Sequence, residues 1–131
     1  MRLVVDAQML LGIADGEIEV HPGHELVGPA AVRSQVVAML LDQVRAGSLD
    51  QRTAVKRLDA LAGIKIRLLN DRVSRRVAFD LAVEHGWDLA DAEYVAVCRL
   101  QADALVTVDK GLAERAAREV EVAPVETLGR A

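Results

Sequence analysis

Three aspartates, Asp6, Asp91 and Asp109, are widely separated in the chain, and each lies at the start of a predicted helix. Asp6 and Asp109 also follow apolar, strand-like runs, RLVV and ALVTV. In a parallel sheet the carboxyl ends of the strands meet at one edge, so distant side chains can converge there. The sequence therefore predicts an acidic pocket at that edge, and this pocket is the first indication of function.

A cluster of carboxylates is unfavourable unless a positive charge lies among them. Two carboxylates about 4 Å apart repel each other by about 4 kcal/mol at an effective dielectric constant of about 20. Repulsion of that size raises the pKa values of the acids or separates their side chains. A divalent ion reverses the sign of the interaction, and oxygen ligands suit Mg²⁺ and Mn²⁺. Because such an ion can activate water and hold a phosphate oxygen, the pattern favours phosphodiester hydrolysis.

Each aspartate also has a structural interpretation. Asp6 and Asp109 could simply cap the helices that follow them. Asp91 could be a first-turn acid that the helix dipole favours. These roles stay open for each residue taken alone, and only the shared sheet edge favours a functional site.

The elements that would position these acids alternate between strand and helix. Strands are predicted at residues 2–5, 64–69, 104–108 and 120–123. Helices are predicted directly after Asp6, at residues 29–47, 48–63, 71–86 and 88–100, and directly after Asp109. Residues 19–29 hold two prolines and two glycines and are predicted as loop, with a short strand at Leu26 and Val27 as the alternative. Pro29 suits a first helical turn, and Ser48 with Gln51 forms a capping-box pattern. The alternation predicts an α/β fold with a parallel sheet covered on both faces.

Composition narrows the class of protein. The chain has 131 residues, of which 52% are hydrophobic, and this fits one domain with one core. No apolar run approaches the roughly 20 residues of a membrane helix, and the N-terminus lacks the pattern of a signal peptide. The single cysteine excludes an internal disulfide framework. We therefore expect a soluble, cytoplasmic protein without membrane association.

The charge and the aromatic content limit how nucleic acid could be held. The net charge is -4, which argues against a strong general affinity for nucleic acid. The chain has only three aromatic residues, Phe79, Trp87 and Tyr94, whereas proteins that stack single-stranded bases need more. If the protein handles nucleic acid, we expect it to do so through phosphates, metal and shape.

Three motifs, RLVVDA, DAEYVAV and ALVTVDKGL, resemble the PIN-domain family and, within it, the VapC ribonuclease toxins of toxin–antitoxin systems. Each motif is short, but their order and spacing make the combination specific. The likeness extends from Arg2 to about Leu128, which implies a single PIN-like domain over residues 1–131. It also implies a three-layer α/β/α fold with a five-stranded parallel sheet of order 3-2-1-4-5. That order would place Asp6 beside Asp109.

The resemblance also carries functional expectations. It implies a Mg²⁺- or Mn²⁺-dependent endoribonuclease that is the toxin of a type II toxin–antitoxin pair. Asp6, Asp91 and Asp109 would then be catalytic metal ligands, and Thr107 would orient a carboxylate or a water. The expected partners are an RNA substrate, a small cognate antitoxin that lies along the active groove, and a second copy in a homodimer.

The chain departs from the family pattern at Gln35, which stands in VRSQVVAML where the family usually has a glutamate. We include Gln35 among the catalytic candidates, as a group that orients a metal-bound water or the phosphate. With three formal negative charges in place of four, we expect weaker metal binding or binding partly through water. The alternative is a catalytically weakened PIN-like module that binds a partner protein. Its candidate contacts, for which core packing is the default, are Met9, Leu10, Leu11 and residues 39–41.

Other residues with chemical potential give weaker signals. Arg33 and Lys110 lie closest in sequence to site residues and are candidates for holding RNA. His21 and His24 form an H-x-x-H pattern, but the further ligands that zinc needs are missing. No glycine-rich phosphate-binding motif of the common kinds occurs.

Overall fold

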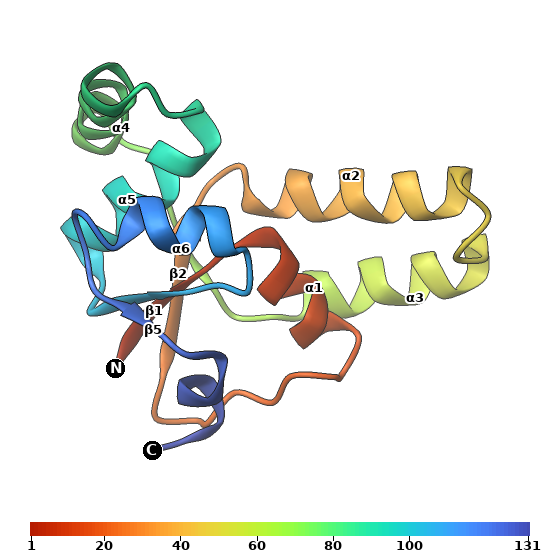
Figure 1. Ribbon diagram of the computed structural model, residues 1–131. Helices are drawn as coiled ribbons and strands as arrows, with labels where there is room; N and C mark the ends of the chain where they lie inside the picture. The colour runs from red at the N-terminus through yellow and green to blue at the C-terminus, as the bar shows by residue number, and fades with distance from the viewer.

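The computed structural model describes residues 1–131 and contains one five-stranded parallel sheet. The strands are β1 (Arg2–Val5), β2 (Glu25–Pro29), β3 (Arg67–Leu69), β4 (Ala104–Val106) and β5 (Val122–Ala123). Their order in the sheet is β3-β2-β1-β4-β5, and every neighbouring pair is parallel. The predicted strand order is therefore confirmed, and β1 lies next to β4 (Figure 1).

Helices cover both faces of this sheet. They are α1 (Ala7–Ala14), α2 (Val32–Arg45), α3 (Gln51–Ala62), α4 (Arg72–His85), α5 (Leu89–Gln101) and α6 (Lys110–Ala116), followed by the short 3-10 helix η1 (Val125–Gly129). Right-handed crossovers place α1, α2 and α3 on one face and α4, α5 and α6 on the other. Contacts follow this division, since α1 packs on α2 and α3, whereas α5 packs on α4 and α6. The result is the expected three-layer α/β/α arrangement, from which the α2–α3 hairpin projects sideways (Figure 1).

Aspartates stand at the start of five of the six α-helices, and four of them cap their helix through the side chain, the exception being Asp88 at α5. The side chains of Asp6, Asp50, Asp71 and Asp109 accept the backbone N–H groups of Met9, Thr53, Ser74 and Leu112, respectively. Each bond satisfies a donor that the first helical turn leaves unpaired. Two of these caps, at α1 and α6, also lie just beyond the carboxyl ends of neighbouring strands. The capping interpretation is therefore confirmed for Asp6 and Asp109, and it also fixes where their carboxylates lie.

Two local predictions were wrong. Pro29 does not open a helix but ends β2, where it pairs with Leu69 beyond the last residue that β2 pairs with β1. The N–H that proline lacks is therefore not needed for the ladder with β1. Ser48 does not cap α3, because Asp50 takes that position and the Ser48 hydroxyl donates to the carbonyl of Gln43 at 3.1 Å. The alternative short strand at residues 26 and 27 is present as β2, which is longer than expected and replaces the end of the predicted loop.

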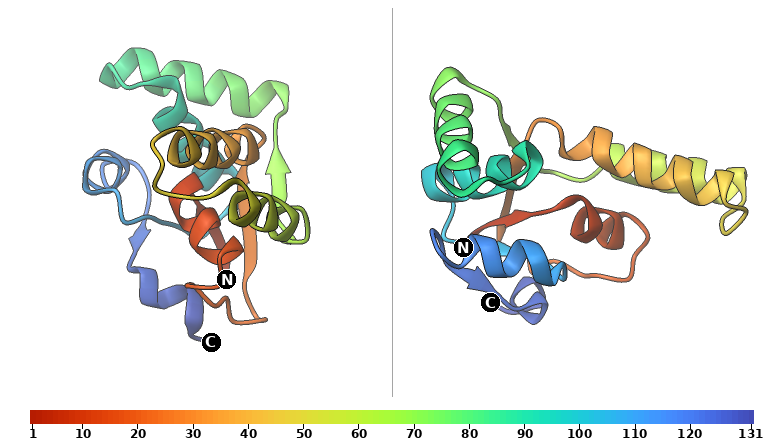
Figure 2. Two further views of the ribbon diagram at one scale, coloured as in Figure 1. Left: turned by 90° about the vertical axis from the view of Figure 1, so that its right-hand side faces the viewer. Right: turned by 45° about the horizontal axis from the view of Figure 1, so that its top comes forward.

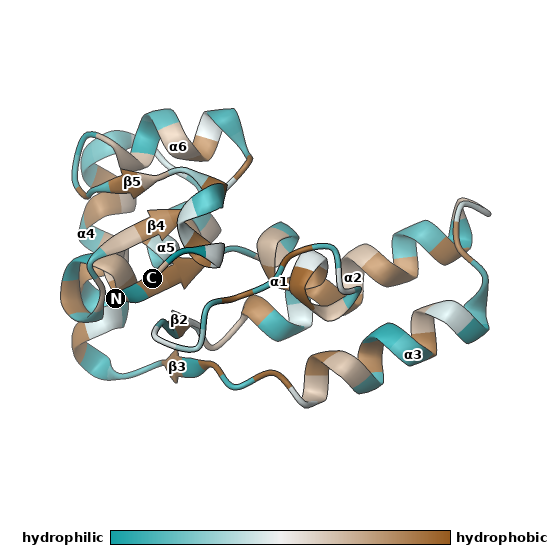
Figure 3. Ribbon diagram, turned by 90° about the horizontal axis from the view of Figure 1, so that it is seen from below, coloured by the Kyte–Doolittle hydropathy of each residue, from teal (hydrophilic) through white to brown (hydrophobic).

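The core lies between the sheet and its helices. A single cluster of 27 buried apolar residues contains the inner residues of β1 and all of β4. In Figure 3 the strands are coloured mostly as hydrophobic, whereas the outer helices alternate between hydrophobic and hydrophilic residues. Met9, Leu10, Leu11 and Leu40 belong to this core, so the interpretation of these four as partner contacts is wrong. Leu41 is 45% exposed and stays a candidate. None of the helices combines the length and apolar character needed to cross a membrane.

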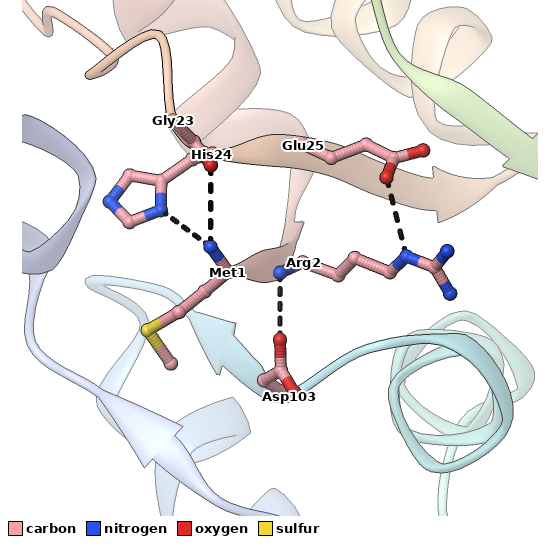
Figure 4. A network of polar contacts seen from close by, with 6 residues as sticks. All are labelled: Met1, Arg2, Gly23, His24, Glu25 and Asp103. Atoms are coloured by element: carbon pink, nitrogen blue, oxygen red, sulfur yellow. Dashed lines mark hydrogen bonds and ion pairs between the residues drawn. The ribbon is translucent and has the colours of Figure 1, made fainter. Parts of the chain in front are cut away.

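A polar network holds the amino ends of three strands together (Figure 4). The backbone N–H of Arg2 donates to Asp103 at 2.8 Å, and the Arg2 guanidinium pairs with Glu25 at 3.3 Å. The amino terminus lies 3.2 Å from His24 Nδ1, and His24 Nε2 lies 2.9 Å from the carbonyl oxygen of Thr127. Both ring nitrogens of His24 are therefore occupied by the chain itself. This residue links the N-terminus to the C-terminal segment, and the H-x-x-H pattern has this structural use.

Candidate active site

Asp6, Asp91 and Asp109 line one open hollow of about 260 Å³ at the carboxyl edge of the sheet. It lies between the first turns of α1, α5 and α6, which begin close to these aspartates. The remaining lining residues are Ala7, Gln8, Gln35, Met39, Ala90, Tyr94 and Leu112. The structure thus brings together the three acids and the glutamine that the sequence analysis singled out. These residues come from four separate parts of the chain.

Asp6 is the most buried acid of the hollow. Its side chain is almost inaccessible, with the residue 5% exposed. One carboxylate oxygen accepts the Met9 N–H at 2.9 Å, and the other accepts the Thr107 hydroxyl. Burial raises the pKa of Asp6, with a smaller contribution from the charge of Asp109, although the bonds from Thr107 and Met9 act in the opposite direction. Asp6 is therefore a buried carboxyl group beside another acid, and it has no ion-pair partner in the chain.

Thr107 connects Asp6 to Asp109. Its hydroxyl donates to Asp6 and accepts the backbone N–H of Asp109 at 3.0 Å. Asp109 in turn accepts the Leu112 N–H at 3.1 Å, which fixes its carboxylate at the start of α6. Because one hydroxyl serves both aspartates, the ends of β1 and β4 hold their acids in a set relation. These two hydrogen bonds are consistent with the role expected for Thr107, which is to orient a carboxylate.

Asp91 has a cationic partner that the sequence analysis did not identify. Arg115, in the last turn of α6, places Nε 2.9 Å and Nη2 2.7 Å from one carboxylate oxygen of Asp91. Gly111 makes room for this guanidinium, because a Cβ at that position would lie 3.0 Å from it. The carboxylates of Asp6, Asp91 and Asp109 do not all lie within 4.8 Å of one another. Arg115 thus supplies one of the acids with the positive charge that the sequence argument assigned to a metal.

Tyr94 is a further site residue that sequence reasoning missed. It is 4% exposed, and its hydroxyl accepts the Ala7 N–H at 3.0 Å while donating to Oε1 of Gln35. Burial, reinforced by the charge of Asp6, raises the pKa of Tyr94, so its proton is retained. The signal was present in DAEYV, where Tyr94 follows Asp91 by three residues and so shares its helix face.

The hydroxyl of Tyr94 also decides what Gln35 can offer. A tyrosine proton needs an acceptor, and the Gln35 carbonyl oxygen meets that need. The amide oxygen is therefore engaged, and the amide N–H groups have no hydrogen-bond partner within the chain, although Gln35 lines the hollow. Gln35 consequently presents hydrogen-bond donors where a glutamate would present a charged acceptor.

The donor set at this edge fits a hard divalent cation. Asp6 and Asp109 offer carboxylate oxygens without a cationic partner, which is the ligand type that Mg²⁺ and Mn²⁺ prefer. Burial, with a smaller contribution from the charge of Asp109, raises the pKa of Asp6, and no cationic side chain of the protein pairs with it. The hollow therefore fits a cation that Asp6 and Asp109 bind directly. Asp91 could become a third ligand only if its contact with Arg115 were broken.

A second group of possible ligands lies elsewhere, where Glu84, His85 and Glu119 approach within 4.8 Å. His85 Nε2 lies 2.7 Å from Glu119, and Arg99 pairs with the other oxygen of the same carboxylate. The hydrogen bond from His85 lowers the pKa of Glu119, and Arg99 acts in the same direction. The charge of Glu119 is thus already compensated, and the group links the end of α4 to α5 and to the segment before β5.

The candidate RNA contacts separate into two cases. Arg33 donates from Nη2 to the carbonyl of Ile64 at 3.1 Å and is half-buried, so it ties α2 to the segment before β3. The expectation that Arg33 holds RNA is therefore not supported by its contacts. Lys110 is exposed directly after Asp109 and stays a candidate for holding RNA.

A larger cavity of about 770 Å³ lies beside the amino ends of β2 and β3, and its lining includes none of Asp6, Asp91 and Asp109.

Comparison with known proteins supports the fold. No protein-family profile and no curated protein matches the sequence. The crystal structure of PAE2754 from Pyrobaculum aerophilum is similar over 98% of this chain and 95% of its own, with 24% identity and a TM-score of 0.71. VapBC-1 from nontypeable Haemophilus influenzae is similar over 96% of this chain and 99% of its own, with 11% identity and a TM-score of 0.62. At these identities the likeness shows the fold alone, which this chain shares with both structures over nearly its whole length.

Proposed function

We propose that this protein is a metal-dependent endoribonuclease that hydrolyses RNA phosphodiester bonds as the toxin of a type II toxin–antitoxin pair. The observation that carries the proposal is the shared hollow, in which Asp6 and Asp109 are joined through Thr107 and accompanied by Asp91. The PIN-like fold and the likeness to VapBC-1 support the same class of enzyme. The proposed partners are therefore RNA, a small antitoxin and a second copy of the chain, in the cytoplasm.

The residues of the hollow divide the work between them. Asp6, Asp109 and, after release from Arg115, Asp91 would hold a Mg²⁺ or Mn²⁺ ion, which supplies positive charge for the phosphate and acidifies water. Thr107 keeps the carboxylate of Asp6 in place before any ligand arrives. Gln35, held by Tyr94, would donate its amide N–H groups to a phosphate oxygen.

Metal-dependent cleavage of RNA tests this function directly. The purified chain is incubated with labelled single-stranded and hairpin RNA in Mg²⁺, in Mn²⁺ and in EDTA, with DNA of the same sequence in parallel. We expect cleavage of RNA with either metal and none in EDTA. Cleavage that persists in EDTA, or intact RNA in every metal at high enzyme concentration, would contradict the proposal.

Restoring the fourth carboxylate is expected to strengthen metal binding. In the Gln35→Glu variant the Tyr94 hydroxyl would still donate to one oxygen, and the second oxygen would add a negative charge to the hollow. We expect the Mn²⁺ concentration for half-saturation to fall by about tenfold or more, since ligand charge tunes such affinities. The measurement is a Mn²⁺ titration of the thermal midpoint without RNA. Gln51→Glu, on exposed α3, is the matched control, and equal affinities in both variants would place residue 35 outside the metal site.

The contact between Arg115 and Asp91 favours a second candidate function. Because Arg115 forms an ion pair with Asp91 and position 35 is a glutamine, only Asp6 and Asp109 offer carboxylates without a cationic partner in the hollow. A catalytically weakened module that binds a partner protein is consistent with this arrangement. Millimolar Mn²⁺ that leaves the thermal midpoint of the chain unchanged would favour the module, whereas a shift favours the enzyme.

A further inference from the structure

The cavity of about 770 Å³ lies at the amino ends of the strands, at the opposite edge of the sheet from the acidic hollow. It forms where two neighbouring strands separate, because β1 pairs with β2 from Glu25, whereas β3 pairs with β2 only from Val27. Figure 2 (left view) shows β2 continuing past the point at which β3 begins. The volume is within the range of roughly 300–1,000 Å³ that is typical of small-molecule sites.

Part of the cavity wall is aliphatic. Ile13 at the end of α1, Val20 in the loop before β2, and Ile64 and Ile66 before β3 are half-buried, whereas Leu26 is buried. These side chains come from separate parts of the chain and belong to the apolar core or pack against it. The lining contains no phenylalanine, tyrosine or tryptophan. The wall therefore suits a saturated hydrocarbon chain better than a nucleobase, which would stack on aromatic rings.

The same cavity carries positive charge that the chain does not pair. Lys65 and Arg67 line it, are exposed, and form neither an ion pair nor a side-chain hydrogen bond within the chain. Glu25 is the only acid in the lining, and Arg2 already pairs with it at 3.3 Å. Because the whole chain has a net charge of -4, these two cations are a local exception. The cavity thus combines an aliphatic wall with cations that are free to meet an anion.

His21 adds a directed hydrogen-bond donor to the lining. Its Nδ1 accepts the backbone N–H of Gly23 at 3.0 Å, so the neutral ring carries its proton on Nε2. This Nε2 has no partner within the chain, whereas both ring nitrogens of the neighbouring His24 are occupied. The donor of His21 is therefore available to a ligand in the cavity that His21 lines.

We propose that this cavity binds a small aliphatic carboxylate, with its hydrocarbon chain on the isoleucines and its carboxylate beside Lys65 and Arg67. Burial of the hydrocarbon chain provides the favourable free energy, and the two cations select the charge of the head group. A free acid is the occupant, because the apolar side chains are half-buried within a concave site, whereas insertion into a lipid surface needs protruding ones. No residue of this cavity lines the acidic hollow, so the inference does not depend on the proposed nuclease.

A titration of the isotope-labelled full chain with octanoate, followed by nuclear magnetic resonance, tests the site. We expect saturable amide shifts in residues 20–26 and 64–67, and none at Asp6, Asp91 or Asp109. Butanoate should bind at least about tenfold more weakly, since each methylene that leaves water adds to the affinity. Octylammonium has the same hydrocarbon chain with the opposite charge, and it should leave residues 64–67 unshifted.

Charge reversal at the two free cations tests the head-group contact. The double variant Lys65→Glu/Arg67→Glu should raise the dissociation constant for octanoate at least about tenfold, because both charges would repel a carboxylate. Arg52→Glu/Lys56→Glu makes the same change of net charge on exposed positions of α3, so it should leave the affinity unchanged. Circular dichroism checks folding, and the milder Lys65→Gln/Arg67→Gln, which should also weaken binding, replaces the reversal if that variant unfolds.

The contradicting results are specific. The proposal is overturned if octanoate gives no saturable shift, or if the shifts centre on Phe79 and Val83, which are 60% and 69% exposed on α4. Equal affinities for butanoate and octanoate would exclude the aliphatic contact, and an affinity that both double variants at positions 65 and 67 leave unchanged would exclude the cations. A tripeptide with a free C-terminal leucine that saturates the same residues more tightly than octanoate would assign the cavity to a peptide end instead. The readout is binding at the amino edge, so failure here would leave the nuclease proposal standing.

Discussion

Replacing Asp6 by asparagine is expected to reduce RNA cleavage at least about a hundredfold while the protein stays folded. Asparagine can still accept the Met9 N–H through its side-chain oxygen, so the cap of α1 is preserved. What is lost is the charge that would hold the cation next to Asp109. Gel-based cleavage assays in Mg²⁺ measure the loss.

The same substitution should raise the stability of the metal-free protein. Burial raises the pKa of Asp6 in the folded state above its ordinary value, so the folded protein holds this proton more tightly than the unfolded chain does. The stability that comes from the protonated form is therefore complete at low pH and is lost as the pH rises through the raised pKa. At neutral pH the wild type contains an unfavourable buried charge, and asparagine removes it. Thermal midpoints in EDTA should be higher for the variant at neutral pH, and the difference should shrink in acid.

A second helix-capping aspartate provides the matched control. Asp50 accepts the Thr53 N–H at 2.8 Å at the start of α3, outside the hollow. Its pKa is lowered by its bonds to Thr53, so the charged form favours folding. Asp50→Asn should therefore keep full activity and gain no stability. Unfolding of the Asp6→Asn variant would show that Asp6 is chiefly structural, and unchanged cleavage would place the chemistry elsewhere.

Saturating Mn²⁺ is expected to stabilise the wild-type protein by about 2.7 kcal/mol at a concentration one hundred times the dissociation constant. A cation between Asp6 and Asp109 removes the repulsion that contributes to the raised pKa of Asp6. Asp109→Asn removes one of the two acids that have no cationic partner, so the increase should disappear in that variant. Differential scanning calorimetry with Mn²⁺ and with EDTA measures the effect.

The second ligand cluster provides the control for this measurement. Glu84 is an exposed member of the group with His85 and Glu119, and it lies outside the hollow. Glu84→Gln should leave the Mn²⁺-dependent increase unchanged if the ion binds among the aspartates. An increase that survives in Asp109→Asn but disappears in Glu84→Gln would move the metal to the His85 group. An increase that is absent from the wild type would favour the binding module.

Local patterns in the sequence determined the architecture of this protein. Alternating strand-like and helical runs predicted the α/β class, the resemblance carried by three short motifs gave the strand order, and the structure confirms both. Asp6 and Asp109 could be placed at one sheet edge because parallel crossovers send every strand end in the same direction. Caps were predictable where an aspartate directly precedes an apolar periodic run, as at Asp71. Pro29 was misplaced because proline suits both a strand end and a first helical turn.

Only the tertiary structure decided which side chains meet across elements. The pairing of Arg115 with Asp91 depends on how α6 lies against α5, and no local period encodes that relation. The hydrogen bond from Tyr94 to Gln35 likewise joins α5 to α2 through two residues that are 59 positions apart in the sequence. Periodicity states which face of a helix is buried, but the partner of a polar group depends on rotation, on side-chain reach and on the competition among buried donors and acceptors. The sequence by itself therefore determined where the acids gather, and the packing decided which of them keep an uncompensated charge.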